Sequence, residues 1–128
     1  MIFVDTNYFI RFLLNDIYSQ HKTAEELFQN GAKGKANLFT STLVIFEIYW
    51  VFTNFYKKTK GEVVDILKNI LSLKFINFEN RDIISDALYL FESSKLELED
   101  CYNITYAKKM HIKDFKTFDK RLEKYIKK

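Results

Sequence analysis

MIFVDTNYFIRFLLN, residues 1–15, places a short apolar run directly before a carboxylate and a second, longer apolar stretch. The first four residues are all apolar, which is typical of a strand buried on both faces of a parallel sheet. Residues 7–15 have the pattern of a helix. Asp5 is therefore expected at the C-terminal end of the first strand, where the first helix begins.

The same alternation of strands and helices continues along the chain. Further strands are expected at residues 36–41, 74–78 and 113–118, each bounded by turn or helix signals. Such an alternation predicts a three-layer α/β/α sandwich with a mainly parallel central sheet of four to five strands. The length of 128 residues is typical of one domain, so we expect a single domain over residues 1–128.

Helices are expected between these strands, and several have recognisable ends. Gly31 is expected to be the C-cap of a helix over residues 19–31. Ser41 or Thr42 can cap a long helix that runs through Tyr56. The remaining helices are expected at residues 60–73, 80–92 and 99–111, with a short basic helix at the end of the chain.

Composition excludes several classes of protein. A hydrophobic content of 48%, with no proline, argues against disorder. A single cysteine, Cys101, cannot form an internal disulfide, which favours a reducing compartment, so the cytoplasm is expected. The apolar region at residues 38–56 is nearly long enough to span a membrane, but Glu47 lies near its middle, where a carboxylate is costly. We therefore expect no membrane span.

Glu47 is the only charged residue in LVIFEIYWVF, residues 43–52. Because apolar residues surround it on the turns above and below, we expect its carboxylate to be buried. A buried carboxylate requires a partner. Two partners remain open from the sequence: an ion pair with Arg11, because arginine suits buried pairs, or a bound metal ion.

Three further acids are expected near the same edge of the sheet as Glu47. Asp5 and Asp119 each follow a predicted strand, and ligands of parallel sheets bind beyond the C-terminal ends of the strands. Asp100 lies in the first turn of its helix. Each aspartate could be a simple helix cap or first-turn acid. Together, the four acids offer oxygen ligands that suit Mg²⁺ or Mn²⁺. The sequence has no cluster of His or Cys residues of the kind that binds zinc.

Positive charge is concentrated at the C-terminal end. Residues 108–128 contain nine Lys or Arg and three acids, a net charge of +6, whereas the rest of the chain has a net charge of −3. A basic region beside Asp119 can bind the phosphates of a nucleic acid. A lysine-rich helix end that is merely solvated explains the same residues.

Four segments together resemble the PIN-domain nucleases, and most closely the VapC-type toxins of bacterial and archaeal toxin–antitoxin pairs. The segments are MIFVDTN, STLVIFEIYWVF, LELEDCYNITYAKK and KTFDKRL, in this order over nearly the whole chain. The resemblance implies a PIN-like fold and a ribonuclease that uses Mg²⁺ or Mn²⁺ to hydrolyse phosphodiester bonds in RNA. It also implies a cognate antitoxin and a homodimer.

By this resemblance, the catalytic and metal-binding residues would be the four acids, Asp5, Glu47, Asp100 and Asp119. Supporting polar residues and RNA-binding residues are expected beside them. The supporting polar residues would be Thr6, Asn7, Asn103 and Thr117, and the RNA-binding residues would be Arg11, Lys116, Lys120 and Arg121.

Two other classes of protein remain open. A strand that ends in aspartate also occurs in phosphatases of the haloacid dehalogenase type, but their pattern needs a second aspartate where this chain has Asn7. A non-catalytic PIN-like module for RNA binding or scaffolding is the other alternative. Loss of at least one acid would be expected for such a module, and all four are present.

Overall fold

The computed structural model describes residues 1–126 and divides the chain into two compact units. Unit 1 is Met1–Asn80 and unit 2 is Arg81–Lys128, described as far as Ile126. The prediction of a single domain over residues 1–128 stays a prediction. Within the described residues, no helix is long and apolar enough to cross a membrane.

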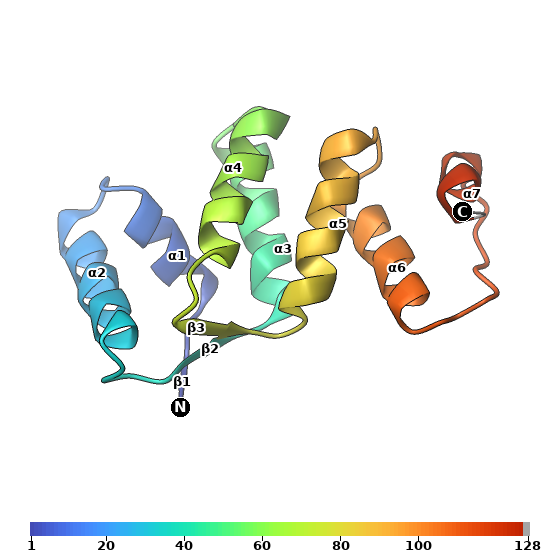
Figure 1. The fold of residues 1–128 in the computed structure, drawn as a ribbon. Coiled ribbons are helices and arrows are strands. Elements are labelled where there is room, and N and C mark those ends of the chain that lie inside the picture. Colours follow the sequence, from blue (N-terminus) through green and yellow to red (C-terminus); the bar gives the residue numbers. More distant parts are fainter. Residues whose placement is uncertain (127–128) are drawn as a thin grey trace. The chain divides into compact units, whose positions relative to one another are not determined.

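Unit 1 contains a parallel sheet of three short strands, in the order β1–β2–β3 (Figure 1). The strands are β1 (Ile2–Phe3), β2 (Leu38–Thr40) and β3 (Ile76–Phe78), and each lies inside a predicted strand. Ile2 is opposite Leu38, and Leu38 is opposite Ile76. The expectation that the first strand is buried on both faces was wrong, because β1 is an edge strand and both of its residues are exposed.

Four α-helices and one π-helical segment complete unit 1. Figure 1 shows the strands gathered at one end of these helices. Helix α1 packs against α2 and α3, and fully buried side chains such as Phe9, Ile45 and Phe52 form the core. The elements are α1 (Thr6–Leu13), α2 (Tyr18–Ala32), α3 (Thr42–Trp50), η1 (Val51–Phe55) and α4 (Lys60–Leu71).

Gly31 does not end its helix as predicted. It lies inside the last turn of α2, and the residue that takes a positive φ just beyond this helix is Gly34, at +76°. A Cβ atom at Gly31 would lie 2.6 Å from Cδ1 of Leu38 and 2.9 Å from Cδ2 of Phe75. The absence of a side chain at this position therefore allows α2 to approach β2 closely.

Unit 2 contains three helices within its described residues: α5 (Arg81–Ser93), α6 (Leu98–Lys109) and α7 (Lys120–Ile126). Helices α5 and α6 pack together, and Lys109 on α6 lies 2.8 Å from Asp86 and 3.5 Å from Asp82 on α5.

The strand predicted at residues 113–118 was wrong, because this segment is an irregular connection between α6 and α7. The sheet therefore has three strands within residues 1–126, rather than the expected four to five. An α/β fold with a parallel sheet is confirmed.

Candidate active site

Asp5 is the N-cap of helix α1. Its Oδ1 accepts a hydrogen bond of 2.8 Å from the backbone N–H of Thr6, as the capping interpretation of this residue predicted. Within residues 1–126, the other carboxylate oxygen, Oδ2, has no hydrogen-bond partner. The cap therefore fixes the position of the carboxyl group and leaves one oxygen available to a ligand.

Thr6 follows Asp5 and carries a buried hydroxyl group without a partner. The residue is 7% exposed, and its Oγ1 has no hydrogen bond to any described residue. A buried polar group that lacks a hydrogen bond costs about 1–3 kcal/mol. Such a cost at the residue next to Asp5 is consistent with a ligand that accepts a hydrogen bond there.

Glu47 is exposed, so the prediction that its carboxylate is buried was wrong. On α3 it shares one helix face with Leu43 and Trp50, which are themselves 67% and 60% exposed. The apolar neighbours therefore do not cover it. The side chain of Glu47 has no hydrogen bond or ion pair within residues 1–126, so the carboxylate is available to a ligand.

Arg11 is not the partner of Glu47, which closes one of the two alternatives. The guanidinium group donates from one terminal nitrogen to both carboxylate oxygens of Asp16, at 3.1 and 3.0 Å, and from Nε to Oε1 of Gln20 at 3.0 Å. A hydrogen bond with Tyr56 and the charge of Asp16 raise the pKa of Arg11. The guanidinium group of Arg11 is therefore bound by residues of its own unit, unit 1.

In unit 2, Asp100 lies in the first turn of α6, as predicted, and is half-buried. Asn103 lies three residues further on, so it shares a helix face with Asp100, and it is exposed. The neighbouring Glu99 has a pKa that is raised by partial burial and by the charges of Glu97 and Asp100. The start of α6 is therefore crowded with negative charge.

Asp119 directly precedes α7, and a single arginine binds its carboxylate. Its Oδ1 accepts hydrogen bonds from the backbone N–H of Arg121 at 2.9 Å and from Nε at 3.1 Å, and its Oδ2 accepts a bond of 2.8 Å from a terminal guanidinium nitrogen. These bonds hold the pKa of Asp119 below its ordinary value. Thr117 supports the turn, because its Oγ1 accepts from the N–H of Asp119 at 3.0 Å. A metal ion at Asp119 would have to displace Arg121.

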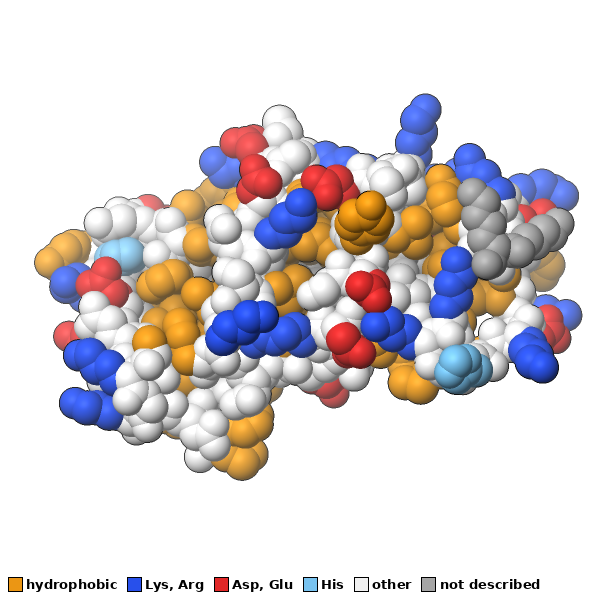
Figure 2. Space-filling view, viewed as in Figure 1, with side chains coloured by type: hydrophobic (Ala, Val, Ile, Leu, Met, Phe, Trp, Pro, Cys, Tyr) orange, Lys and Arg blue, Asp and Glu red, His pale blue; other side chains and the backbone are white. Residues whose placement is uncertain are grey.

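The two remaining basic residues proposed for RNA binding differ in their contacts. Lys116 lies 3.3 Å from Asp114, but its side chain is 87% exposed, so this ion pair is weak and easily exchanged. Lys120 is exposed and makes no hydrogen bond or ion pair to any residue that the structure describes. On the face shown in Figure 2, Lys and Arg side chains are interspersed with acidic and apolar ones rather than gathered in one patch.

The donor chemistry of the four acids fits a hard divalent cation. All four offer carboxylate oxygens, which Mg²⁺ and Mn²⁺ prefer, and no His or Cys stands among them. Asp5 and Glu47 belong to unit 1, and Asp100 and Asp119 belong to unit 2. Within neither unit do three or more His, Cys, Asp or Glu among residues 1–126 form a metal site. The convergence of all four acids therefore stays a prediction.

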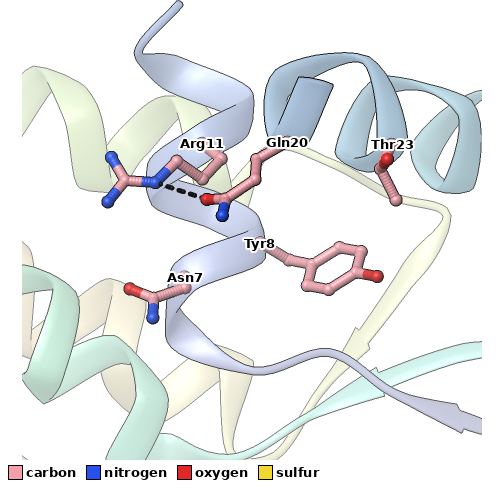
Figure 3. A pocket seen from close by; sticks show the side chains of 5 residues that line it. All are labelled: Asn7, Tyr8, Arg11, Gln20 and Thr23. Carbon is pink, nitrogen blue, oxygen red and sulfur yellow. Dashed lines mark hydrogen bonds between the residues drawn. The ribbon is translucent and has the colours of Figure 1, made fainter. Parts of the chain in front are cut away.

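A pocket of about 290 Å³ lies between α1 and α2, close along the chain to Asp5 (Figure 3). The sequence indicated Asn7 and Arg11 as site residues, but not the two residues that α2 contributes, Gln20 and Thr23. Both are exposed polar residues on a surface helix, and no sequence signal distinguishes them from other such residues. The lining residues are Asn7, Tyr8, Arg11, Gln20 and Thr23.

Comparison with known proteins identifies the class. Residues 2–128 match the model of the PIN domain family, so the chain belongs to that family. The match covers both units. The chain is also similar to a VapC ribonuclease of Aquifex aeolicus (strain VF5), with 27% identity over 124 residues, which cover 97% of this chain and 91% of that protein. The family expected from the four sequence segments is thus confirmed.

Proposed function

We propose that this protein is a metal-dependent endoribonuclease and the toxin of a toxin–antitoxin pair. The observation that carries the proposal is the similarity to a VapC ribonuclease over 97% of the chain. The four acids of the sequence prediction support it, because each is present and two of them, in unit 1, have carboxylate oxygens that no other described residue occupies.

In this proposal Asp5, Glu47, Asp100 and Asp119 hold Mg²⁺ or Mn²⁺. Such an ion, when bound, makes a nucleophile of water at neutral pH and stabilises the negative charge that develops on the leaving oxygen. The helix cap at Asp5 fixes the direction of its free oxygen. The hydroxyl group of Thr6, which lacks an internal partner, donates a hydrogen bond to a group bound beside Asp5.

The substrate is RNA, held by basic and polar side chains around the acids. Lys116, Lys120 and Arg121 contact phosphates, with an affinity that falls as salt concentration rises. Arg11 lines the α1–α2 pocket. It is not available as a cation for phosphate, because the carboxylate of Asp16 neutralises its charge. The supporting polar residues are Asn7, Asn103 and Thr117, of which Thr117 accepts a hydrogen bond from the backbone of Asp119.

The partners are a cognate antitoxin and a second copy of the chain, and the compartment is the cytoplasm. Support for a protein interface comes from three large apolar side chains of α3 and η1 that are exposed: Leu43 at 67%, Trp50 at 60% and Phe55 at 72%. Exposed apolar groups of this size are typical of surfaces that another protein covers. Cys101, the single cysteine of the chain, is buried and cannot form an internal disulfide, which fits a reducing compartment.

The test is cleavage of a panel of labelled RNAs in Mg²⁺, in Mn²⁺ and in EDTA. We expect cleavage only with metal, and loss of cleavage in Glu47→Gln, because the glutamine keeps the size of the side chain but removes the charge. Glu26→Gln is the matched control, since Glu26 is also exposed on a helix of unit 1 and is not among the four acids. Equal cleavage with metal and with EDTA would contradict the proposal.

One observation favours the alternative of a non-catalytic PIN-like module that binds RNA or acts as a scaffold. Arg121 occupies both oxygens of Asp119, as it would if this acid had only a structural role. The same experiment separates the two functions. A non-catalytic module would bind the RNA panel and leave every RNA intact in both metals.

A further inference from the structure

The pocket between α1 and α2 has a lining that suits an uncharged, polar and aromatic ligand. None of its lining residues carries a carboxylate, and its one cation, Arg11, is neutralised by Asp16. A free phosphate or a peptide carboxylate would therefore find no available counter-charge there. The pocket is partly open to solvent, and Tyr8, which is 38% exposed, contributes an aromatic ring.

Hydrogen bonds inside unit 1 fix the direction of two polar groups in this pocket. Oε1 of Gln20 accepts from Nε of Arg11, so the amide nitrogen of Gln20 remains as a donor. Figure 3 shows this nitrogen directed toward the space between Asn7 and Tyr8. The hydroxyl group of Thr23 donates to the backbone oxygen of Ser19, so its oxygen remains as an acceptor.

The pocket therefore presents one oriented donor, one oriented acceptor, a free amide and an aromatic ring. The free amide is that of Asn7, whose side chain makes no hydrogen bond within residues 1–126. Side-chain amides pair with the edges of nucleobases, and aromatic rings stack on the faces of unpaired bases. A volume of about 290 Å³ lies at the small end of ligand pockets, which suits one base rather than a larger molecule.

We propose that the α1–α2 pocket binds one unpaired nucleobase of the RNA, with the base stacked on Tyr8 and its edge read by Gln20. This inference rests on the proposed function, because it names what the RNA places beside the candidate active site. Asp5 is the cap of the helix that carries Asn7 and Tyr8, so the pocket begins within about one turn of that acid. A base held here positions the adjoining phosphodiester near Asp5.

The test measures binding of short fluorescent single-stranded RNAs in EDTA, where metal-dependent cleavage cannot occur. Tyr8→Leu removes the aromatic ring, and we expect it to weaken binding about tenfold or more. Tyr8→Phe retains the ring and should bind within about twofold of the parent protein, since stacking does not need the hydroxyl group. Tyr18→Leu is the matched control, because Tyr18 is an exposed tyrosine of the same unit that does not line the pocket.

A second variant tests how the base edge is read. Gln20→Glu retains an oxygen that accepts from Arg11 but replaces the free donor with an acceptor. We expect it to change the order of preference among RNAs that differ in one base, and melting curves should show that the fold is retained. An unchanged order of preference would overturn the role of Gln20.

Abasic RNA distinguishes a base from the RNA backbone. On RNA that lacks its bases, Tyr8→Leu and the parent protein should bind equally, because the group that stacks is absent. Equal binding of intact RNA by both proteins would overturn the inference, and would be expected if the pocket were instead a peptide site. No RNA binding by the parent protein would overturn it together with the proposed function. A Tyr8 effect in EDTA without cleavage in Mg²⁺ would support the pocket and contradict only the proposed hydrolysis.

Discussion

Asp5 has two separable roles, as a helix cap and as a ligand for a metal ion, and two substitutions distinguish them. Asp5→Asn removes the charge but retains an oxygen that can accept from the N–H of Thr6. Asparagine and aspartate are about equally good caps, so we expect the free energy of unfolding to change by less than about 0.5 kcal/mol. Asp5→Ala removes the cap as well, which costs about 1 kcal/mol. In a chain of this size, that cost lowers the melting temperature by about 4 °C.

Both variants should lose RNA cleavage by a factor on the order of a hundred or more, because a bound metal contributes several kcal/mol of transition-state stabilisation. The assay is cleavage of a labelled RNA in Mg²⁺, with a melting curve recorded for each protein. Asp65→Asn is the matched control, because Asp65 is an exposed aspartate on α4 of the same unit. An Asp5→Asn variant that folds normally and cleaves at the parent rate would refute the metal role of Asp5.

Two further predictions concern packing and charge. Gly31→Ala should destabilise the fold, because a clash with Leu38 costs about 1–3 kcal/mol and the gain in helix propensity is about 1 kcal/mol. Gly61→Ala, on the open side of α4, should stabilise the fold by about 0.4–1 kcal/mol. The measurement is the free energy of unfolding by chemical denaturation, and a change of the same sign in both variants would contradict the packing argument. Arg121→Gln should raise the pKa of Asp119, measured by NMR, toward its ordinary value, and should tighten Mg²⁺ binding in a calorimetric titration. The pKa of Asp119 is lower in the folded protein than its ordinary value. The Asp119–Arg121 pair therefore stabilises the fold above the ordinary pKa of aspartate, and this stabilisation is lost as the pH falls through the lowered pKa, below about pH 4. Unchanged metal affinity would show that Arg121 does not compete for this carboxylate.

Local features of this fold could be predicted from the sequence because neighbouring residues determine them. Asp5 caps α1, Ser41 caps α3 through a bond of 3.3 Å from the N–H of Val44, and Asp100 lies in the first turn of α6. Each depends on side-chain and backbone groups within three residues. The three strands of the sheet were also predicted, because each lies in a short stretch rich in apolar residues that leads into a helix.

Glu47 shows where a local pattern misleads. Its neighbours are almost all apolar, yet apolar residues also cover much of the surface of folded proteins. Leu43 and Trp50, one helical turn on either side, are exposed together with it. Sequence periodicity alone could not reveal this, because every face of α3 carries apolar residues.

The segment at residues 113–118 failed as a strand for a related reason. Phe115 and Thr117 are half-buried while Lys116 and Phe118 are exposed, so the side chains alternate along this segment as they would in a strand. A strand also requires hydrogen bonds to a neighbouring strand, and the sequence of one segment cannot show whether such a neighbour exists.

The candidate site could be predicted only in part, since its four acids come from distant parts of the chain. The sequence suggested which acids could form the site, and that these four do so stays a prediction. It could not show that Arg121 occupies Asp119 or that α2 supplies Gln20 to a pocket, because these contacts depend on side-chain directions.

A crystal structure of the protein with Mn²⁺, with the metal located by its anomalous scattering, tests the central claim most directly. We expect a manganese peak in direct contact with carboxylate oxygens of Asp5, Glu47, Asp100 and Asp119, with Arg121 displaced from Asp119. A manganese ion bound elsewhere, or any of the four carboxyl groups directed away from the shared ion, would contradict the account.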